Sequence, residues 1–177
     1  MDPDLERVLA DLPAVPPWHT LSVESARRLE EELFSTAVDH DCTVSEFGID
    51  GPGGHLPMRA YRPAEGPLPT LVFYHGGGWT LGTLDSVEPV CVEVADRVGC
   101  LVLSVDYRLA PEHPFPAAVE DAWAALEWAL EHADAIGGDG TVAVGGTSSG
   151  GGLAAATAVR AREESVHVAA QLLLYPM

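Results

Sequence analysis

Hydrophobic periodicity changes along the chain at about residue 70. After that point, short apolar runs of strand length alternate with stretches whose apolar positions recur every three or four residues, as in helices that cover a sheet. Strands are predicted at 70–75, 100–105, 141–145 and 168–175. Helices are predicted at 86–98, from a proline-rich turn to its end at Gly137-Gly138, and from a serine-glycine stretch to about Arg162. This alternation requires a mostly parallel sheet with right-handed crossovers, so the predicted fold class is α/β.

The N-terminal part of the chain follows another pattern. Residues 1–41 have helix and loop character, and Ser22 or Ser25 is placed to cap a helix through 26–34. From Thr43 onward, apolar and polar residues alternate on both sides of a glycine-rich turn, which predicts an antiparallel hairpin. The sequence therefore divides into an N-terminal helical segment, 1–41, and an α/β core, 42–177.

Charge limits the classes of partner. The 177 residues contain 9 Arg, no Lys, and 27 Asp and Glu, so the formal net charge is −18. A surface of this sign repels nucleic acid phosphates and anionic lipid, and we expect neither a nucleic acid nor a membrane partner. Two explanations of the acidity stay open at this stage: a solubilising surface, or adaptation to high salt.

Cysteine usage and the N-terminus bear on the cellular compartment. Cys42, Cys91 and Cys100 form no C-x-x-C pair and are odd in number, so no disulfide framework is expected. Cys91 and Cys100 lie in apolar surroundings typical of buried thiols. The first residues are acidic and lack the basic start and apolar stretch of a secretion signal, and no apolar run has the length of a membrane span. These features predict a cytoplasmic protein.

The clearest chemical signal is the stretch Gly146-Thr147-Ser148-Ser149-Gly150, directly after the predicted strand 141–145. A G-x-S-x-G sequence between a strand and a helix is the pattern of a nucleophile elbow, in which a sharp turn exposes a serine hydroxyl. The pattern is weak alone, because an ordinary strand-to-helix turn also uses glycine. Ser148 is the candidate nucleophile.

A second glycine motif strengthens this interpretation. His75-Gly76-Gly77-Gly78-Trp79 ends the strand 70–75, and a loop of this type supplies backbone N–H groups to an oxyanion hole. The amide of the residue after the nucleophile, Ser149, supplies another donor. A phosphate-binding loop is excluded, since neither glycine run has the G-x-x-x-x-G-K-[ST] spacing and the chain has no Lys.

Four motifs in order carry a family resemblance: YHGGGW at 74–79, DYRLAPEHPFPA at 106–117, the elbow, and LLYP at 173–176. Together they resemble the hormone-sensitive-lipase family of α/β-hydrolases along essentially the whole chain. The resemblance implies an α/β-hydrolase fold and a serine carboxylesterase that cleaves short- to medium-chain acyl esters without a cofactor or metal. It also implies that Ser148 forms the acyl-enzyme and that Gly77, Gly78 and Ser149 form the oxyanion hole. Helices around Trp18 and Phe34 would belong to a cap over the acyl pocket.

Two departures from the family pattern affect this expectation. The usual elbow is GDSAGGN, and here Thr147, Ser149 and Gly152 replace its Asp, Ala and Asn. The substitution at Ser149 is expected to matter little, because this residue contributes its amide.

The second departure concerns the acid and the base. In this fold both follow the serine in the chain, yet after Ser148 the sequence offers only Glu163 and Glu164 on the elbow's own helix, and His167 at the far end of the next strand. We therefore expect that these 177 residues lack the catalytic Asp and His, which the family places beyond two further strands. The other histidines, His75 and His113 among them, are interpreted as loop-shaping, exposed or packing residues.

Two alternatives to an esterase remain. Plant gibberellin receptors resemble the same family, keep the serine elbow, lose the catalytic histidine and use the pocket for binding. By analogy with these receptors, the first alternative is a non-catalytic small-molecule-binding protein on a hydrolase scaffold. The second alternative is an inactive gene fragment. Trp79 and Tyr107 follow strand ends and are candidate pocket walls, although packing explains both equally well. The sequence leaves the oligomeric state open.

Overall fold

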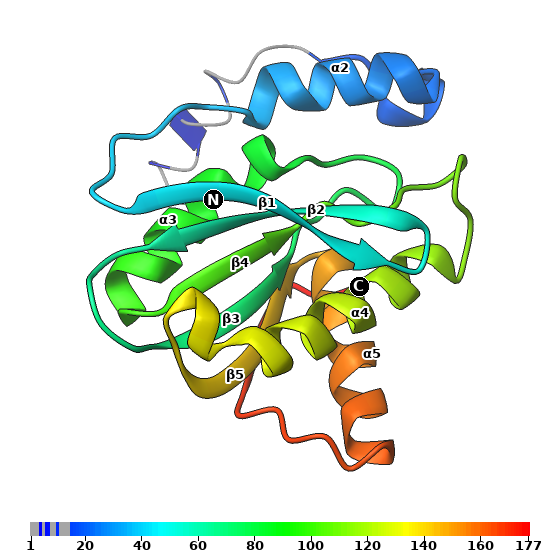
Figure 1. Ribbon diagram of the computed structural model, residues 1–177. Coiled ribbons are helices and arrows are strands. Elements are labelled where there is room, and N and C mark those ends of the chain that lie inside the picture. Colours follow the sequence, from blue (N-terminus) through cyan, green and yellow to red (C-terminus); the bar gives the residue numbers. More distant parts are fainter. Residues whose placement is uncertain (1–3, 5, 8–9, 11–14) are drawn as a thin grey trace.

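The computed structural model describes residues 4, 6–7, 10 and 15–177. Six strands form a single sheet in the order β1-β2-β4-β3-β5-β6, with helices on both of its faces (Figure 1). The strands are β1 (Thr43–Gly51), β2 (Gly54–Arg62), β3 (Leu68–Tyr74), β4 (Leu101–Val105), β5 (Gly138–Thr147) and β6 (Gln171–Leu174). The α-helices are α2 (Val23–Phe34), α3 (Leu84–Val98), α4 (Ala117–His132) and α5 (Ser149–Glu163), and 3-10 turns span Trp18–Thr20 and Asp134–Ile136.

Strand pairing confirms the predicted α/β class. β1 and β2 form the predicted antiparallel hairpin, and β2 joins the remaining sheet antiparallel to β4. β3 pairs in parallel with β4 and β5, and β5 pairs in parallel with β6. The carboxyl ends of these four strands therefore meet at one edge of the sheet, where ligands bind in open α/β folds.

Three predicted boundaries were wrong. The last strand begins at Gln171 instead of residue 168, because the preceding residues approach β5 only through isolated bonds such as Ala169 N–H to the Val142 carbonyl, 2.8 Å. The helix before β5 ends at His132, and a 3-10 turn follows it. Gly138 does not end that helix but begins β5, which is longer than predicted.

Helix ends follow the capping chemistry of the sequence. The Ser22 side chain caps α2 by accepting a hydrogen bond from the Ser25 amide, which decides between the two candidate caps. Thr83 and Ser86 form a capping box at the start of α3, and Gly99 ends this helix in the left-handed conformation, as predicted.

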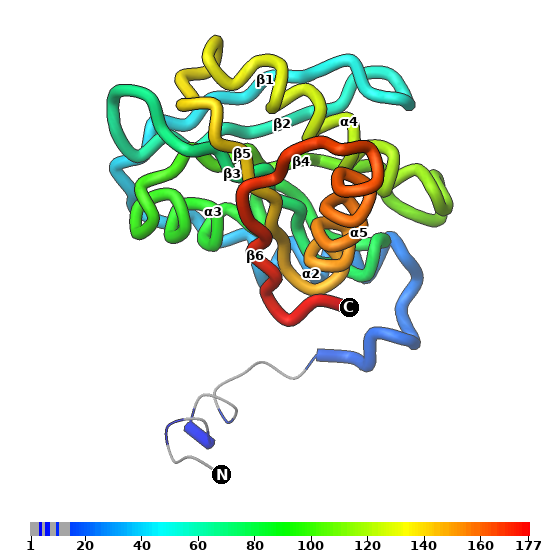
Figure 2. The backbone as a smooth tube through the Cα atoms, turned by 90° about the horizontal axis from the view of Figure 1, so that it is seen from below, coloured from blue at the N-terminus to red at the C-terminus, as the bar shows by residue number. Residues whose placement is uncertain are grey.

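The core has two layers, one on each face of the sheet. On one face α4 and α5 pack against residues that include Met58, Val72 and Leu103. On the other face α3 packs through Cys91 and Val87 on a layer that includes Phe73. Figure 2 shows β6 and the C-terminal segment beside α5 at one edge of the sheet. These layers hold the strand ends rigidly in place and so position the loops that follow them.

All three cysteines are free thiols and buried. Burial raises the pKa of the Cys91 thiol to about 12, so this thiol stays protonated in the core, in agreement with its predicted burial.

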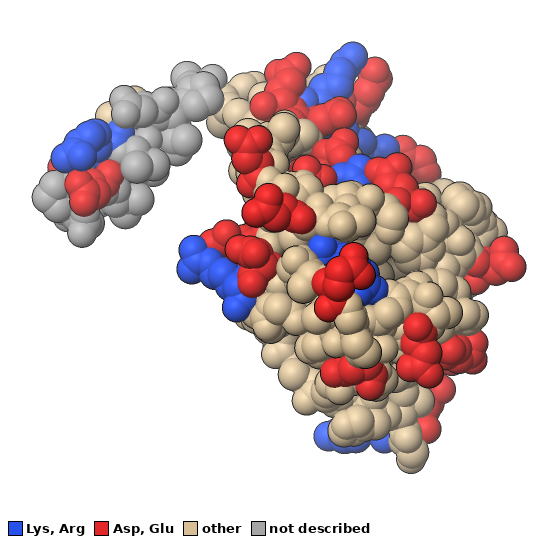
Figure 3. All heavy atoms as spheres, turned by 60° about the vertical axis from the view of Figure 1, so that its left-hand side comes forward, with Lys and Arg blue, Asp and Glu red and all other residues tan. Residues whose placement is uncertain are grey.

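In the face shown in Figure 3, acidic side chains outnumber basic ones, in keeping with the net charge of −18. No helix in the described part of the chain is long and apolar enough to cross a membrane. The prediction that the chain begins without a secretion signal rests on residues 1–6, and most of these lie outside the described residues.

Candidate active site

Ser148 lies at the turn between β5 and α5 with φ 50° and ψ −118°. This backbone conformation is rare for a residue with a Cβ atom, and strain of this kind concentrates at functional sites. The Ser148 amide donates a hydrogen bond to the Leu174 carbonyl oxygen at 2.9 Å, and the Ser148 carbonyl accepts one from the Gly152 amide at 3.1 Å. β6 and the first turn of α5 thus hold the strained residue from both sides.

The last glycine of the motif explains why the elbow is so tight. A Cβ atom on Gly150 would lie 2.0 Å from the Tyr74 carbonyl oxygen at the end of β3. No side chain fits there, because the start of α5 lies directly against the neighbouring strand.

The loop after β3 lies directly beside the elbow. A Cβ atom on Gly76 would come within 3.4 Å of the Ser148 Cβ atom, so the two motifs form adjacent walls of one site. Gly77 has φ 116°, and a Cβ atom there would lie 2.1 Å from the Leu81 carbonyl oxygen. Gly78 has φ 61° and open space around it. The structure therefore brings the predicted residues Gly77, Gly78, Ser148 and Ser149 to the same strand ends.

Ser149 has a contact that the sequence did not predict. Its side chain is fully buried, and its hydroxyl oxygen accepts a hydrogen bond of 3.4 Å from the Trp79 amide. This bond joins the elbow to the glycine loop. The signal available in the sequence was a hydroxyl residue in place of the family's Ala.

His75 and Tyr107 are buried beneath the glycine loop that follows β3 and support it. The His75 ring stacks on the Tyr107 ring with 4.3 Å between centroids, and the Tyr107 hydroxyl donates to the His75 carbonyl oxygen at 2.9 Å. His75 Nδ1 lies 2.7 Å from the Gly76 carbonyl oxygen. Burial lowers the pKa of His75 to about 4, so this imidazole is neutral at pH 7. Tyr107 is thus a buried support of the loop.

Ser148 opens into a cavity of about 410 Å³, the serine pocket. Trp18 and Phe34 from the N-terminal segment line it, and Val87 and Val90 of α3 form an apolar wall. Trp79, a predicted pocket wall, lines another cavity that also contains Phe115 and Met177.

The histidine and carboxylates that follow Ser148 in the sequence do not lie beside it. Within the described residues, no imidazole or carboxylate forms a hydrogen bond with the Ser148 hydroxyl. His167 precedes β6, whose far end, Leu174, is the part that pairs beside the elbow at Thr147. His167 therefore lies at the opposite edge of the sheet from Ser148.

Comparison with known proteins places these features in a family. A family described as the alpha/beta hydrolase fold matches residues 71–177. The chain is 52% identical over 141 residues to the carboxylic ester hydrolase LipN of Mycobacterium tuberculosis, covering 75% of this chain and 38% of LipN. It is 32% identical over 160 residues to the gibberellin receptor GID1 of rice, covering 88% of this chain and 45% of the receptor.

Solved structures agree with these relatives. A Pyrobaculum calidifontis esterase superposes with a TM-score of 0.88 at 40% identity, covering 99% of this chain and 58% of the esterase. The chain spans about half the length, or less, of the curated relatives named above. From the family match, the relatives and the motifs together, the chain belongs to the hormone-sensitive-lipase family of α/β-hydrolases.

Proposed function

We propose that the protein is a serine carboxylesterase whose nucleophile is Ser148. The observation that carries the proposal is the strained backbone of Ser148 at the head of α5, directly beside the glycine loop, where both line a cavity of about 410 Å³. Relatives named as ester hydrolases support it. The substrates are short- to medium-chain carboxylic esters, since the serine pocket is small and has apolar walls from α3.

The chemistry follows from the residues at this edge of the sheet. The Ser148 oxygen attacks the ester carbonyl carbon, and the negative charge that develops on the carbonyl oxygen is stabilised by the amides of Gly77, Gly78 and Ser149. The carbon–oxygen bond to the alcohol then breaks, and the alcohol leaves with a proton, so that an acyl group remains on Ser148. Water hydrolyses this acyl-enzyme to release the carboxylic acid and the free serine.

A base must accept the serine proton and return it to the leaving alcohol. In our proposal an Asp and a His from sequence beyond residue 177 perform this role, because the relatives are about twice as long as this chain. Buried His75 supports the loop, and it is a weak base because burial lowers its pKa to about 4.

The N-terminal segment completes the pocket in this proposal. Trp18 and Phe34 line the serine pocket. We assign residues 1–41 to a cap that covers the acyl group and 42–177 to the hydrolase core. The described part of this cap contains α2 and the turn Trp18–Thr20.

Hydrolysis of p-nitrophenyl butyrate tests the proposal. The assay uses the native-length protein, that is, the natural protein with any sequence that follows residue 177. Turnover that saturates with substrate supports an esterase. Absence of turnover from a folded protein favours the second candidate, a small-molecule-binding protein, for which the similarity to the rice receptor is the specific observation.

We expect Ser149→Ala to keep kcat within about fivefold of the unchanged protein. The variant retains the backbone amide at 149, which is the proposed oxyanion donor, and loses the 3.4 Å bond to the Trp79 amide and the contact of the hydroxyl with Tyr107. Steady-state kinetics with p-nitrophenyl butyrate measures this. A loss of about 100-fold or more would mean that the hydroxyl itself takes part in the reaction.

A further inference from the structure

A second cavity of about 570 Å³, here called the acidic pocket, lies at the carboxyl end of β4. The turn of the β1–β2 hairpin, helix α2 and the segment 106–113 surround it. It adjoins the serine pocket, and Glu30 lines both cavities; Gly76 and Gly77 of the glycine loop line the serine pocket, whereas Gly82 and Thr83 at the end of that loop line the acidic pocket. The family motifs assign no role to it.

The charges around this pocket do not balance. Its lining contains five carboxylates and two guanidinium groups. Arg27 pairs with Glu112 at 2.7 Å, and Arg108 pairs with Asp121 at 2.8 Å, so both cations are already held by carboxylates. The carboxylates left over are Glu30, Glu31 and Asp106. His55 and His113 also line the pocket.

Glu30 is the residue that points to a ligand. Its side chain is only 8% exposed, and Oε2 is buried without a hydrogen-bond partner. Burial raises the pKa of Glu30, although the Ser86 hydroxyl and the Gly82 amide act in the opposite direction. A buried carboxylate with an unused oxygen is costly to a fold, and such groups need an external explanation.

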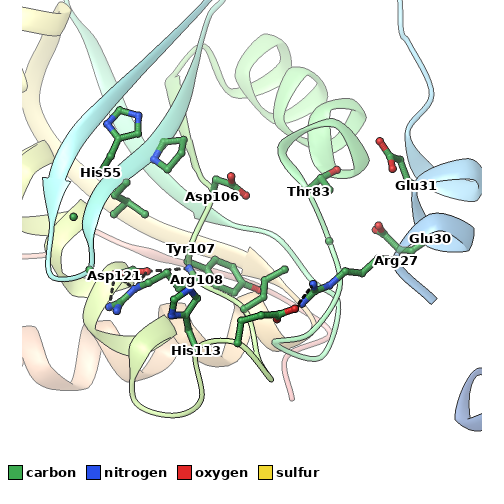
Figure 4. Close-up of a pocket in the computed structure, with 17 residues that line it drawn as sticks. Arg27, Glu30, Glu31, His55, Thr83, Asp106, Tyr107, Arg108, His113 and Asp121 are labelled. Carbon is green, nitrogen blue, oxygen red and sulfur yellow. Dashed lines mark hydrogen bonds and ion pairs between the residues drawn. The ribbon is translucent and has the colours of Figure 1, made fainter. Parts of the chain in front are cut away.

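Asp106 lies across the pocket from this carboxylate. Figure 4 shows Glu30 and Glu31 extending from α2 on one side, Asp106 at the end of β4 on the other, and Thr83 between them. Partial burial raises the pKa of Asp106, while Arg59 lowers it. Arg59 already bridges Glu46, Asp85 and Glu88, so it leaves little positive charge for a fourth carboxylate.

We propose that the acidic pocket binds a small aliphatic amine or diamine, whose ammonium groups pair with Glu30 and Asp106. An ammonium group supplies the donor that Glu30 Oε2 lacks and the positive charge that the lining lacks. A bare metal ion fits less well, since the described residues contain no group of three or more His, Cys, Asp or Glu side chains that could hold one. Binding of such an amine requires no esterase turnover, although Glu30 also lines the serine pocket.

Calorimetric titration of putrescine into the native-length Ser148→Ala variant, at pH 8 and low ionic strength, tests the proposal without any turnover. We expect one bound diamine per chain and no heat from butane-1,4-diol, which has similar length but no charge. Absence of saturable binding would overturn the proposal. Displacement of putrescine by MgCl2 beyond the effect of NaCl at equal ionic strength would instead identify a metal site and would also overturn it.

Matched variants separate the pocket from the general acidity of the surface. Glu30→Gln should weaken putrescine binding about tenfold, because it removes a buried charged acceptor. Glu32→Gln removes an exposed carboxylate from the same helix outside the pocket, and should change binding less than about twofold. Equal weakening by both variants would show that the diamine only follows net charge, and the proposal would fail.

Thermal unfolding of the same variants will show whether Glu30→Gln folds, since a folded variant unfolds in a cooperative transition. The folded state holds Glu30 at a raised pKa, so this group favours folding below its ordinary pKa of about 4.5, and the benefit is lost as pH rises through the folded value. Glu30→Gln should therefore raise Tm by about 2–4 °C at pH 8 and change it little at pH 4. A lower Tm at pH 8 would mean that Glu30 is a structural anchor, contrary to the proposal.

Discussion

Replacing Ser148 with Ala should lower kcat for p-nitrophenyl butyrate by about 10⁴- to 10⁶-fold in the native-length protein. In the proposed mechanism this hydroxyl is the atom that becomes acylated, so nothing else in the site replaces it. Ala keeps the Cβ atom, so the positive φ of 50° and its strain persist, and Tm should change by less than about 2 °C.

Ser165→Ala is the matched control. Ser165 also has a positive φ, 59°, but it is exposed in the turn after α5, far along the chain from the elbow. We expect its kcat to equal that of the unchanged protein. A Ser148→Ala variant that keeps more than about a tenth of the activity would contradict the assignment of the nucleophile.

Replacing Gly150 with Ala should destabilise the fold by about 3 kcal/mol or more. The added Cβ atom would lie 2.0 Å from the Tyr74 carbonyl oxygen and 2.3 Å from the His75 carbonyl oxygen. Both are backbone atoms of the central strand and its loop, so α5 must move away from β3. For a domain of this size the expected fall in Tm is about 6–12 °C, measured by calorimetry. Activity should also fall, because the movement separates Ser148 from the glycine loop.

Gly53→Ala is the control for this substitution. A Cβ atom on Gly53 would also have a close contact, 2.6 Å, but with the guanidinium of Arg108, a side-chain group that shifts more readily than backbone atoms although it pairs with Asp121. We expect a change of less than about 1 kcal/mol there. Equal destabilisation by both variants would show that the tight approach of α5 to β3 does not limit stability.

Local pattern was sufficient to predict most of the fold. The alternation of apolar runs with helical faces predicted the parallel strands, and the glycine-rich turn at 51–54 predicted the hairpin. The errors lie at strand and helix ends. Residues 168–170 are apolar and small but make only isolated bonds to β5, and hydrophobicity alone does not reveal where a ladder begins.

The candidate site was less completely predictable. Two glycine motifs at strand ends were sufficient to nominate Gly77, Gly78, Ser148 and Ser149. The buried hydroxyl of Ser149 and the stack of Tyr107 on His75 depend on contacts between segments far apart in the sequence. Glu30 is one of three consecutive glutamates in α2, and only the packing of that helix decides which of them is buried.

The most direct test of the central claim is the site of covalent modification by a fluorophosphonate ester. This reagent phosphonylates an activated serine hydroxyl with loss of fluoride and stays attached. Incubation of the native-length protein, followed by intact-mass measurement and peptide mapping, should give one adduct per chain, on Ser148. An adduct on another residue, or no adduct on a protein that hydrolyses p-nitrophenyl butyrate, would contradict the assignment of Ser148 as the nucleophile.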